Sequence, residues 1–135
     1  MRDRAVLDSG VIFSLYFEED ASERAANVVD KLSPITIDLA VAEVGNAAWK
    51  RVALFKESKE STRASLYKCL EYIKSCTVIC TSDLAGMAYE IALENKTTFY
   101  DSLFLAAAER EEVTLLTLDK KMCEKARAKR NVQMI

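Results

Sequence analysis

Short apolar runs alternate along the chain with longer stretches in which apolar residues recur at helical spacing. A short apolar run bounded by polar residues is typical of a buried strand, and apolar positions three or four apart are typical of one helix face. The predicted strands span residues 5–7, 35–37, 77–80, 114–117 and 132–135. The predicted helices span 11–17, 21–32, 39–55, 57–75, the stretch after 81–83 to about 94, a segment around Asp101, and 120–129.

Two polar segments are expected to set element boundaries. Ser33 and Pro34 should end the helix at 21–32, because proline excludes the residue before it from the α region. The segment 81–83, Thr-Ser-Asp, offers N-cap side chains for the helix that follows.

The alternation of strands and helices predicts the fold class. Short apolar strands separated by helices indicate parallel pairing with helices on both faces of the sheet. We therefore expect one domain over residues 1–135, a three-layer α/β/α Rossmann-like fold with a central parallel sheet. Such sheets bind ligands outside the carboxyl ends of their strands, where the strand order reverses.

Composition narrows the possible functions. The chain has no histidine, which excludes Ser–His–Asp and Cys–His catalysis, imidazole-based nucleases and the usual Cys/His zinc patterns. Cys76 and Cys80 lie four apart across an apolar segment and are expected in the core. No apolar run approaches the roughly 20 residues of a membrane span, and no signal-peptide core follows the charged N-terminus. We therefore expect a cytoplasmic protein with no membrane partner.

Three aspartates are predicted to meet at one edge of the sheet. Asp8 follows the first strand, Asp119 follows the strand at 114–117, and Asp101 opens its helix. Each alone could simply cap a helix or complement a helix dipole. Their convergence on the edge where ligands bind favours a functional site.

Glu43 supplies a fourth acid from an otherwise uncharged stretch, residues 39–45, with Asn46 one turn further on the same face. A carboxylate in such a stretch needs a cation or a proton, and a salt bridge to a nearby lysine or arginine is one alternative. Four acids without basic partners would repel one another unless a metal neutralised them. Oxygen ligands alone indicate Mg²⁺ or Mn²⁺, which activate water for attack on phosphate.

Four segments of the chain stand out: V-L-D-S at 6–9, A-E-V-G-N at 42–46, Y-D-S-L-F-L-A-A-A-E at 100–109 and T-L-D at 117–119. Together they resemble the PIN domain family, and within it the VapC group of toxin ribonucleases. The resemblance spans nearly the whole chain, and the segment at 100–109 followed by T-L-D is its most specific part. Carried over by position, Asp8, Glu43, Asp101 and Asp119 match the family's acidic quartet, and Ser9 and Thr117 match polar residues that support it.

The resemblance implies Mg²⁺- or Mn²⁺-dependent cleavage of single-stranded RNA, a homodimer, and inhibition by a cognate antitoxin. That antitoxin would insert a segment into a groove near the active site. We expect Asp8 and Asp101 to be the principal metal ligands. Asp119 and Glu43 would complete the site or accept a proton from the attacking water, and Thr117 would orient Asp119.

Lys120 and Lys121 are candidate RNA-binding residues. They lie in a first helical turn, where the helix dipole disfavours cations, so contact with RNA phosphate would explain their position. A solvated helix face is the alternative. The net charge of −2 means that RNA affinity should depend on such local groups and on metal.

Other acid-based functions fit less well. A dehalogenase-like phosphatase needs an acid two residues after its nucleophilic aspartate, whereas Ser9 and Gly10 follow Asp8. A phospho-receiver domain needs paired acids after its first strand, whereas this chain has the single Asp8 there. Two alternatives stay open beside a toxin: a housekeeping RNA-processing PIN nuclease, and a non-catalytic PIN-like module that binds RNA or protein. There is no Walker A glycine loop.

Overall fold

The computed structural model describes residues 2–135. Within that range five strands form one parallel sheet in the order β3-β2-β1-β4-β5. The strands are β1 (Asp3–Leu7), β2 (Leu32–Ile37), β3 (Thr77–Ile79), β4 (Thr114–Thr117) and β5 (Val132–Met134). The helices are α1 (Ser9–Tyr16), α2 (Ser22–Val29), α3 (Leu39–Ala53), α4 (Lys59–Ser75), the short 3₁₀ turn η1 (Thr81–Asp83), α5 (Ala85–Asn95), α6 (Phe99–Glu111) and α7 (Lys120–Ala126).

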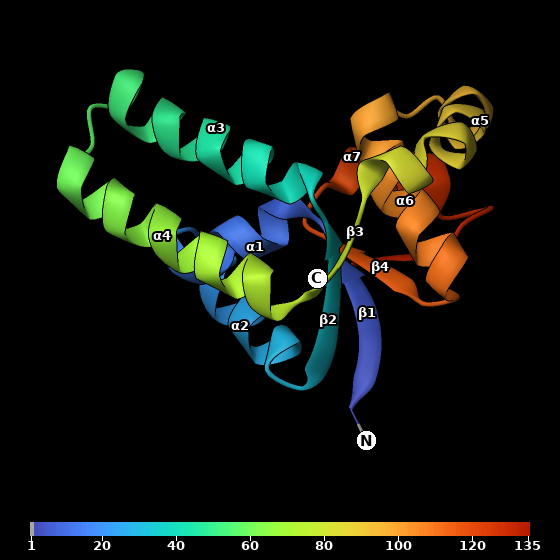
Figure 1. Ribbon diagram of the computed structural model, residues 1–135, viewed down its shortest axis with the longest axis horizontal. Coiled ribbons are helices and arrows are strands. Elements are labelled where there is room, and N and C mark those ends of the chain that lie inside the picture. The colour runs from blue at the N-terminus through green and yellow to red at the C-terminus, as the bar shows by residue number, and fades with distance from the viewer. Residues whose placement is uncertain (1) are drawn as a thin grey trace.

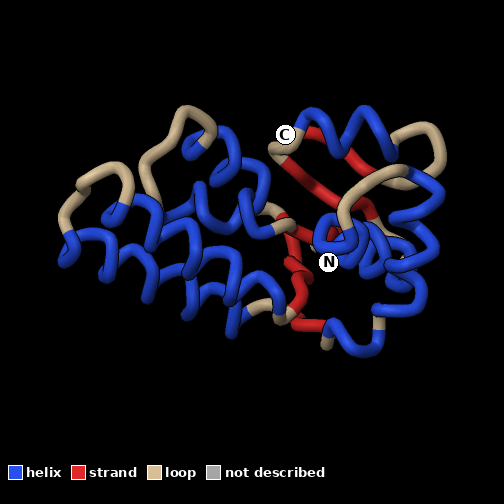
Figure 2. The backbone as a smooth tube through the Cα atoms, turned by 90° about the horizontal axis from the view of Figure 1, so that it is seen from above, coloured by secondary structure: helices blue, strands red, loops and turns tan. Residues whose placement is uncertain are grey.

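The sheet separates two groups of helices, which confirms the predicted three-layer arrangement. Helices α1 to α4 lie on one side, and α5 and α6 lie on the other, together with α7 against β5 (Figure 1). Seen from above, the strands form the narrow middle layer between the two helical layers (Figure 2). Helices α3 and α4 pack together as a hairpin that extends away from the sheet (Figure 1).

The strand order places a topological switch point between β1 and β4. From β1 the chain crosses over to β2 on one side, whereas from β4 it crosses over to β5 on the other. Crossovers between parallel strands are right-handed, so the helices that follow β1 and β4 cover opposite faces of the sheet. The carboxyl ends of these two neighbouring strands therefore form the crevice in which such folds bind ligands.

The predicted boundary at Ser33 and Pro34 was wrong. Helix α2 already ends at Val29, and both residues lie inside strand β2, where Pro34 pairs with Ala5. Proline is tolerated there because β3 begins to pair with β2 only at Ile35, so β2 is still an edge strand at Pro34.

Three other local predictions also differ from the structure. The segment Thr81–Asp83 forms η1, and no side chain caps α5, so the predicted N-cap was wrong. Cys80 is exposed and lies beyond β3, whereas Cys76 is buried as expected. Helix α7 ends at Ala126, three residues before the predicted end, after which the chain turns back toward β5.

The buried core is built from the strands and from the inner faces of the helices on both sides, with α6 contributing a continuous run of buried residues from Leu103 to Ala108. Its largest fully buried side chains include Leu7, Ile12, Ile37, Phe104 and Leu115. Within residues 2–135, no helix is both long enough and apolar enough to cross a bilayer.

Candidate active site

Asp8 lies at the switch point, in the chain between the end of β1 and the start of α1. Its backbone N–H bonds to the Leu116 carbonyl of β4, which fixes the end of β1 against the neighbouring strand. The side chain is the N-cap of α1, because Oδ1 accepts a hydrogen bond from the Val11 N–H at 3.0 Å. Its other oxygen, Oδ2, accepts a hydrogen bond from the Thr117 hydroxyl at 2.5 Å. With 7% of its surface exposed, this carboxyl group is fixed in orientation and largely removed from water.

Thr117 connects Asp8 to Asp119. Its buried hydroxyl donates to Asp8 and accepts the backbone N–H of Asp119 at 2.9 Å. The Asp119 side chain caps α7 by accepting the Met122 N–H at 3.0 Å. We predicted that Thr117 would orient Asp119 by donating a hydrogen bond to it, and this was wrong. The Thr117 hydroxyl donates to the Asp8 carboxylate instead, and it accepts a hydrogen bond from the backbone of Asp119.

Asp101 lies in the first turn of α6, as predicted. Thr98 is the N-cap of that helix, and its hydroxyl accepts the Asp101 N–H at 3.0 Å. Asp101 is half-buried, and burial is the main cause that raises its pKa. The charge of Asp119 raises it further, while Thr98 and the cationic Lys125 of α7 act in the opposite direction.

Glu43 reaches the same place from α3. Its Oε1 accepts a hydrogen bond from the Ser9 hydroxyl at 2.7 Å, so the residue after Asp8 holds the fourth acid. The side chain is partly buried, and burial is the main cause that raises its pKa. The hydrogen bond from Ser9 acts against this shift, and the charge of Asp101 adds to it. No ion pair within residues 2–135 involves Glu43, so the alternative of a salt bridge is not realised there.

The four acids influence one another electrostatically. Burial raises the pKa of Asp8 to about 6, against two hydrogen bonds that lower it, and the charges of Asp101 and Asp119 raise it further. None of the four forms an ion pair with another residue of the described range, 2–135. Carboxylate oxygens are the ligands that Mg²⁺ and Mn²⁺ prefer.

The carboxylates are not yet in the arrangement of bound ligands. In the part of the chain that the structure describes, no three acidic or cysteine side chains converge closely enough to hold one ion. A metal would have to draw these side chains closer together; Asp101 is half-buried and Asp119 is exposed. The donor set therefore fits a hard divalent cation in its chemistry.

A cleft of about 550 Å³ opens beside the acids. It is lined by Glu43 itself and by the chain neighbours of the three aspartates, namely Ser9, Tyr100 and Leu118. Its volume falls within the range of about 300–1,000 Å³ that is usual for ligand sites. Phe13 of α1 and Lys50 of α3 also line the cleft, and neither they nor the exposed Tyr100 of α6 were among the predicted site residues.

The remaining predicted residues differ in their positions. Asn46 is exposed and lines the cleft together with Glu43, as one helical turn between them requires. Lys120 and Lys121 are exposed in the first turn of α7 and do not line the cleft. Lys125, which the sequence did not single out, is the cation that acts on Asp101. Its place on the same helix as the two predicted lysines could have indicated it.

The fold and the site together define an α/β/α domain whose acidic residues lie at the β1/β4 switch point. The model of the PIN domain family matches residues 5–128. Ribonuclease VapC3 of Pyrobaculum aerophilum is 34% identical over 125 residues, which cover 90% of this chain and 94% of that protein. The chain therefore belongs to the PIN domain family, and within it resembles the VapC group.

Solved structures agree on the fold. The crystal structure of PAE2754 from Pyrobaculum aerophilum has a TM-score of 0.71 at 22% identity, over 99% of this chain and 92% of that chain. A toxin–antitoxin complex from Klebsiella pneumoniae has a TM-score of 0.71 at 16% identity, over 96% and 95% of the two chains. At such identities the similarity establishes the fold alone.

Proposed function

We propose that this protein is a Mg²⁺- or Mn²⁺-dependent endoribonuclease that cleaves single-stranded RNA. The observation that carries the proposal is the group of four carboxylates that form no ion pair within the described residues, beside an open cleft at the switch point. The 34% identity to Ribonuclease VapC3 supports the choice of RNA as the substrate.

The carboxylates divide the work by their environments. Asp8, fixed by two hydrogen bonds, and Asp101, in the first turn of α6, would hold the metal ion, and Asp119 would complete its ligand set. When bound, the ion would supply positive charge that activates water and stabilises the charge that builds up on the phosphate. Thr117 keeps the Asp8 carboxylate in one orientation throughout.

Glu43 is the best placed proton acceptor. It lines the cleft, and the Ser9 hydroxyl occupies only its Oε1, which leaves Oε2 for the proton of the attacking water. Its raised pKa makes it a stronger base than an ordinary glutamate.

Purified protein should therefore cleave single-stranded RNA faster than structured RNA in Mg²⁺ or Mn²⁺, and should not cleave it in EDTA. Asp8→Asn and Asp101→Asn should each abolish cleavage with an unchanged circular dichroism spectrum. Asp20→Asn, which alters an exposed acid between α1 and α2, is the matched control. Cleavage that survives EDTA, or that both site variants retain, would refute metal-carboxylate catalysis.

We further propose that the protein is a homodimeric cytoplasmic toxin of a type II toxin–antitoxin pair, with a small antitoxin protein as its partner. The resemblance to VapC ribonucleases supports this assignment. Expression should arrest growth, Asp101→Asn should relieve the arrest, and a small protein encoded beside the gene should relieve it too. Growth without arrest, although RNA is cleaved in vitro, would favour a housekeeping nuclease. Sedimentation velocity tests the dimer.

A further inference from the structure

The cleft beside the acids has lining groups that catalysis does not use. Tyr100 presents a side chain that is 60% exposed although it directly precedes Asp101. Asn46 and Lys50 lie one turn apart on α3, both exposed, and both line the same cleft. The cleft thus combines an aromatic ring, an amide and an ammonium group, which are the three groups that bind a nucleotide's base face, base edge and phosphate.

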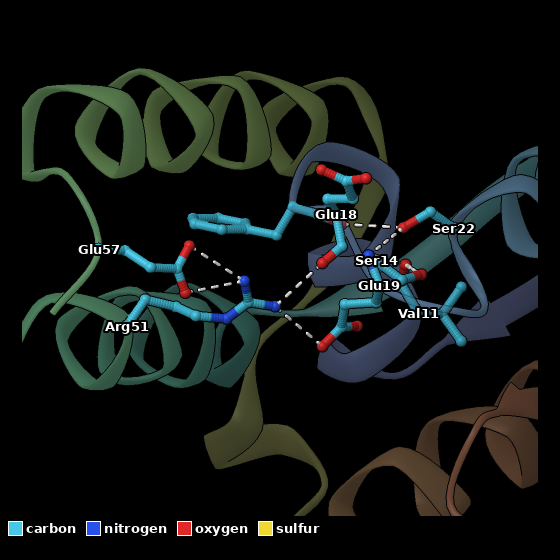
Figure 3. Close-up of polar contacts among 8 residues, drawn as sticks. Val11, Ser14, Glu18, Glu19, Ser22, Arg51 and Glu57 are labelled. Atoms are coloured by element: carbon cyan, nitrogen blue, oxygen red, sulfur yellow. Dashed lines mark hydrogen bonds and ion pairs between the residues drawn. The ribbon is translucent and has the colours of Figure 1, made fainter. Parts of the chain in front are cut away.

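Beside the cleft, Arg51 of α3 bonds to Glu57 and to two residues that follow α1, Glu18 and Glu19 (Figure 3). Its guanidinium group forms ion pairs with Glu19 at 3.3 Å and with Glu57 at 3.1 Å. It also lies over the rings of Phe13 and Phe17, at 5.3 and 5.7 Å from their centroids, and these two rings are stacked on each other. Phe13 and Glu19 line the cleft, so Arg51 contacts two residues of its wall.

We propose that this cleft is a nucleobase subsite, in which Tyr100 stacks on one unpaired RNA base next to the cleaved bond and Asn46 recognises the edge of that base. Lys50 contacts a neighbouring phosphate. The proposal rests on the proposed ribonuclease function and adds to it the residues that select the cleavage sequence. Stacking requires an unstacked base, which explains why the substrate should be single-stranded.

Continuity with the acidic site favours a base over a protein segment as the occupant. Ser9, Tyr100 and Leu118 each adjoin one of the three aspartates, and Glu43 belongs to both the cleft and the acidic site. A nucleotide whose phosphate lies at the carboxylates would therefore have its base within reach of the cleft. The amide of Asn46 offers a donor and an acceptor side by side, which is the arrangement that pairs with a base edge.

The test uses random-sequence single-stranded RNA, with the cleaved ends sequenced for each variant. Wild-type protein should prefer particular bases at one position beside the cleaved bond. Asn46→Ala should reduce that preference about tenfold, which is within the discrimination of one paired base contact. Tyr100→Ala should raise KM for short RNA about tenfold by removing the stacking ring, and Tyr100→Phe should restore most of the loss.

Binding of a fluorescent oligonucleotide in EDTA gives a second measurement that needs no cleavage. The Tyr100 variants should follow the same order there as in KM. Tyr89→Ala removes a ring that is 57% exposed on α5 and does not line the cleft, so it should match wild type in both measurements.

The outcomes separate the subsite from the nuclease. If wild type cleaves RNA, and Asn46→Ala and Tyr100→Ala leave both the sequence preference and KM unchanged, the subsite is refuted and the ribonuclease stands. The subsite is also refuted if the two variants weaken binding of a protein partner only, because the cleft is then a protein groove. If wild type neither cleaves nor binds RNA, the ribonuclease proposal fails, and the subsite fails with it.

Discussion

Replacing Asp8 by asparagine is expected to stabilise the metal-free protein at neutral pH while abolishing its activity. Asp8 is 7% exposed, and its burial raises its pKa from 3.8 to about 6. A difference of about two pH units between the folded and unfolded pKa values corresponds to about 3 kcal/mol, at 1.36 kcal/mol for each unit. The folded state loses that free energy when Asp8 ionises, and asparagine, which cannot ionise, avoids the loss; because its NH2 group cannot accept the second of the two hydrogen bonds, from Val11 and Thr117, about 1 kcal/mol of the gain is offset.

The pH dependence has a definite direction. Because the folded-state pKa lies above the unfolded-state value, the contribution of this carboxyl group to stability is fully present below about pH 4 and is lost as the pH rises through about 6. Urea unfolding in EDTA, followed by circular dichroism between about pH 4 and pH 8, measures the free energy of unfolding. Asp8→Asn should gain up to about 3 kcal/mol over wild type across this range, and Asp20→Asn should follow wild type.

Metal should make wild type more stable to unfolding than Asp8→Asn. Adding Mg²⁺ or Mn²⁺ stabilises whichever folded state binds it, by RT ln(1 + [metal]/Kd). Wild type should therefore gain stability on addition of metal, and Asp8→Asn should gain much less. A difference in unfolding free energy between the two proteins that is the same at pH 4 and pH 8 would show that burial does not raise the pKa, and the reasoning would be wrong.

Three further substitutions test other parts of the structure. Thr117→Val removes the buried hydroxyl that connects Asp8 to the backbone of Asp119. The free energy of unfolding in urea should fall by about 1–3 kcal/mol, because the backbone N–H of Asp119 loses its partner. An unchanged free energy of unfolding would contradict this connecting role. Arg51→Met keeps an apolar stem but removes ion pairs that are partly screened by solvent, so it should cost about 1 kcal/mol in stability. It should also raise KM for RNA with little change in kcat. An unchanged KM would mean that Arg51 does not support the residues that line the cleft. Replacing both Lys120 and Lys121 by alanine should make the plot of log affinity for single-stranded RNA against log salt concentration less steep by about 1.4, at about 0.7 for each lost phosphate contact. An unchanged slope would mean that both lysines contact only solvent.

The acids of the site were predictable because their positions follow from local rules. Asp8 and Asp119 each end a strand and cap the helix that follows, so strand ends alone bring them to one sheet edge. Glu43 was detectable because it interrupts an uncharged helical stretch. Asp8 and Asp119 also cap helices as the alternative interpretation expected, each through one carboxylate oxygen, Oδ1.

The features that could not be predicted from the sequence depend on contacts between distant segments of the chain. The Thr117 hydroxyl could be predicted to lie near an acid, but its choice of Asp8 depends on the pairing of β1 with β4. Pro34 obeys the rule that it cannot continue a helix, yet only the late start of β3 makes it acceptable within β2. Tyr100 of α6 and Lys50 of α3 line the same cleft although they are far apart in the sequence, and no sequence pattern records that.

The pairing of β1 with β4 also affects when the protein can become active. The bond from Thr117 to Asp8 joins residues that are 109 positions apart, so the site depends on one of the longest loop closures in the chain. A nascent chain that ends before β4 lacks Asp119, the hydroxyl that orients Asp8, and the central neighbour of β1. Contacts of such high sequence separation form late and slowly. If the proposed nuclease activity is correct, a growing chain would therefore lack part of its site until β4 and Asp119 have been made.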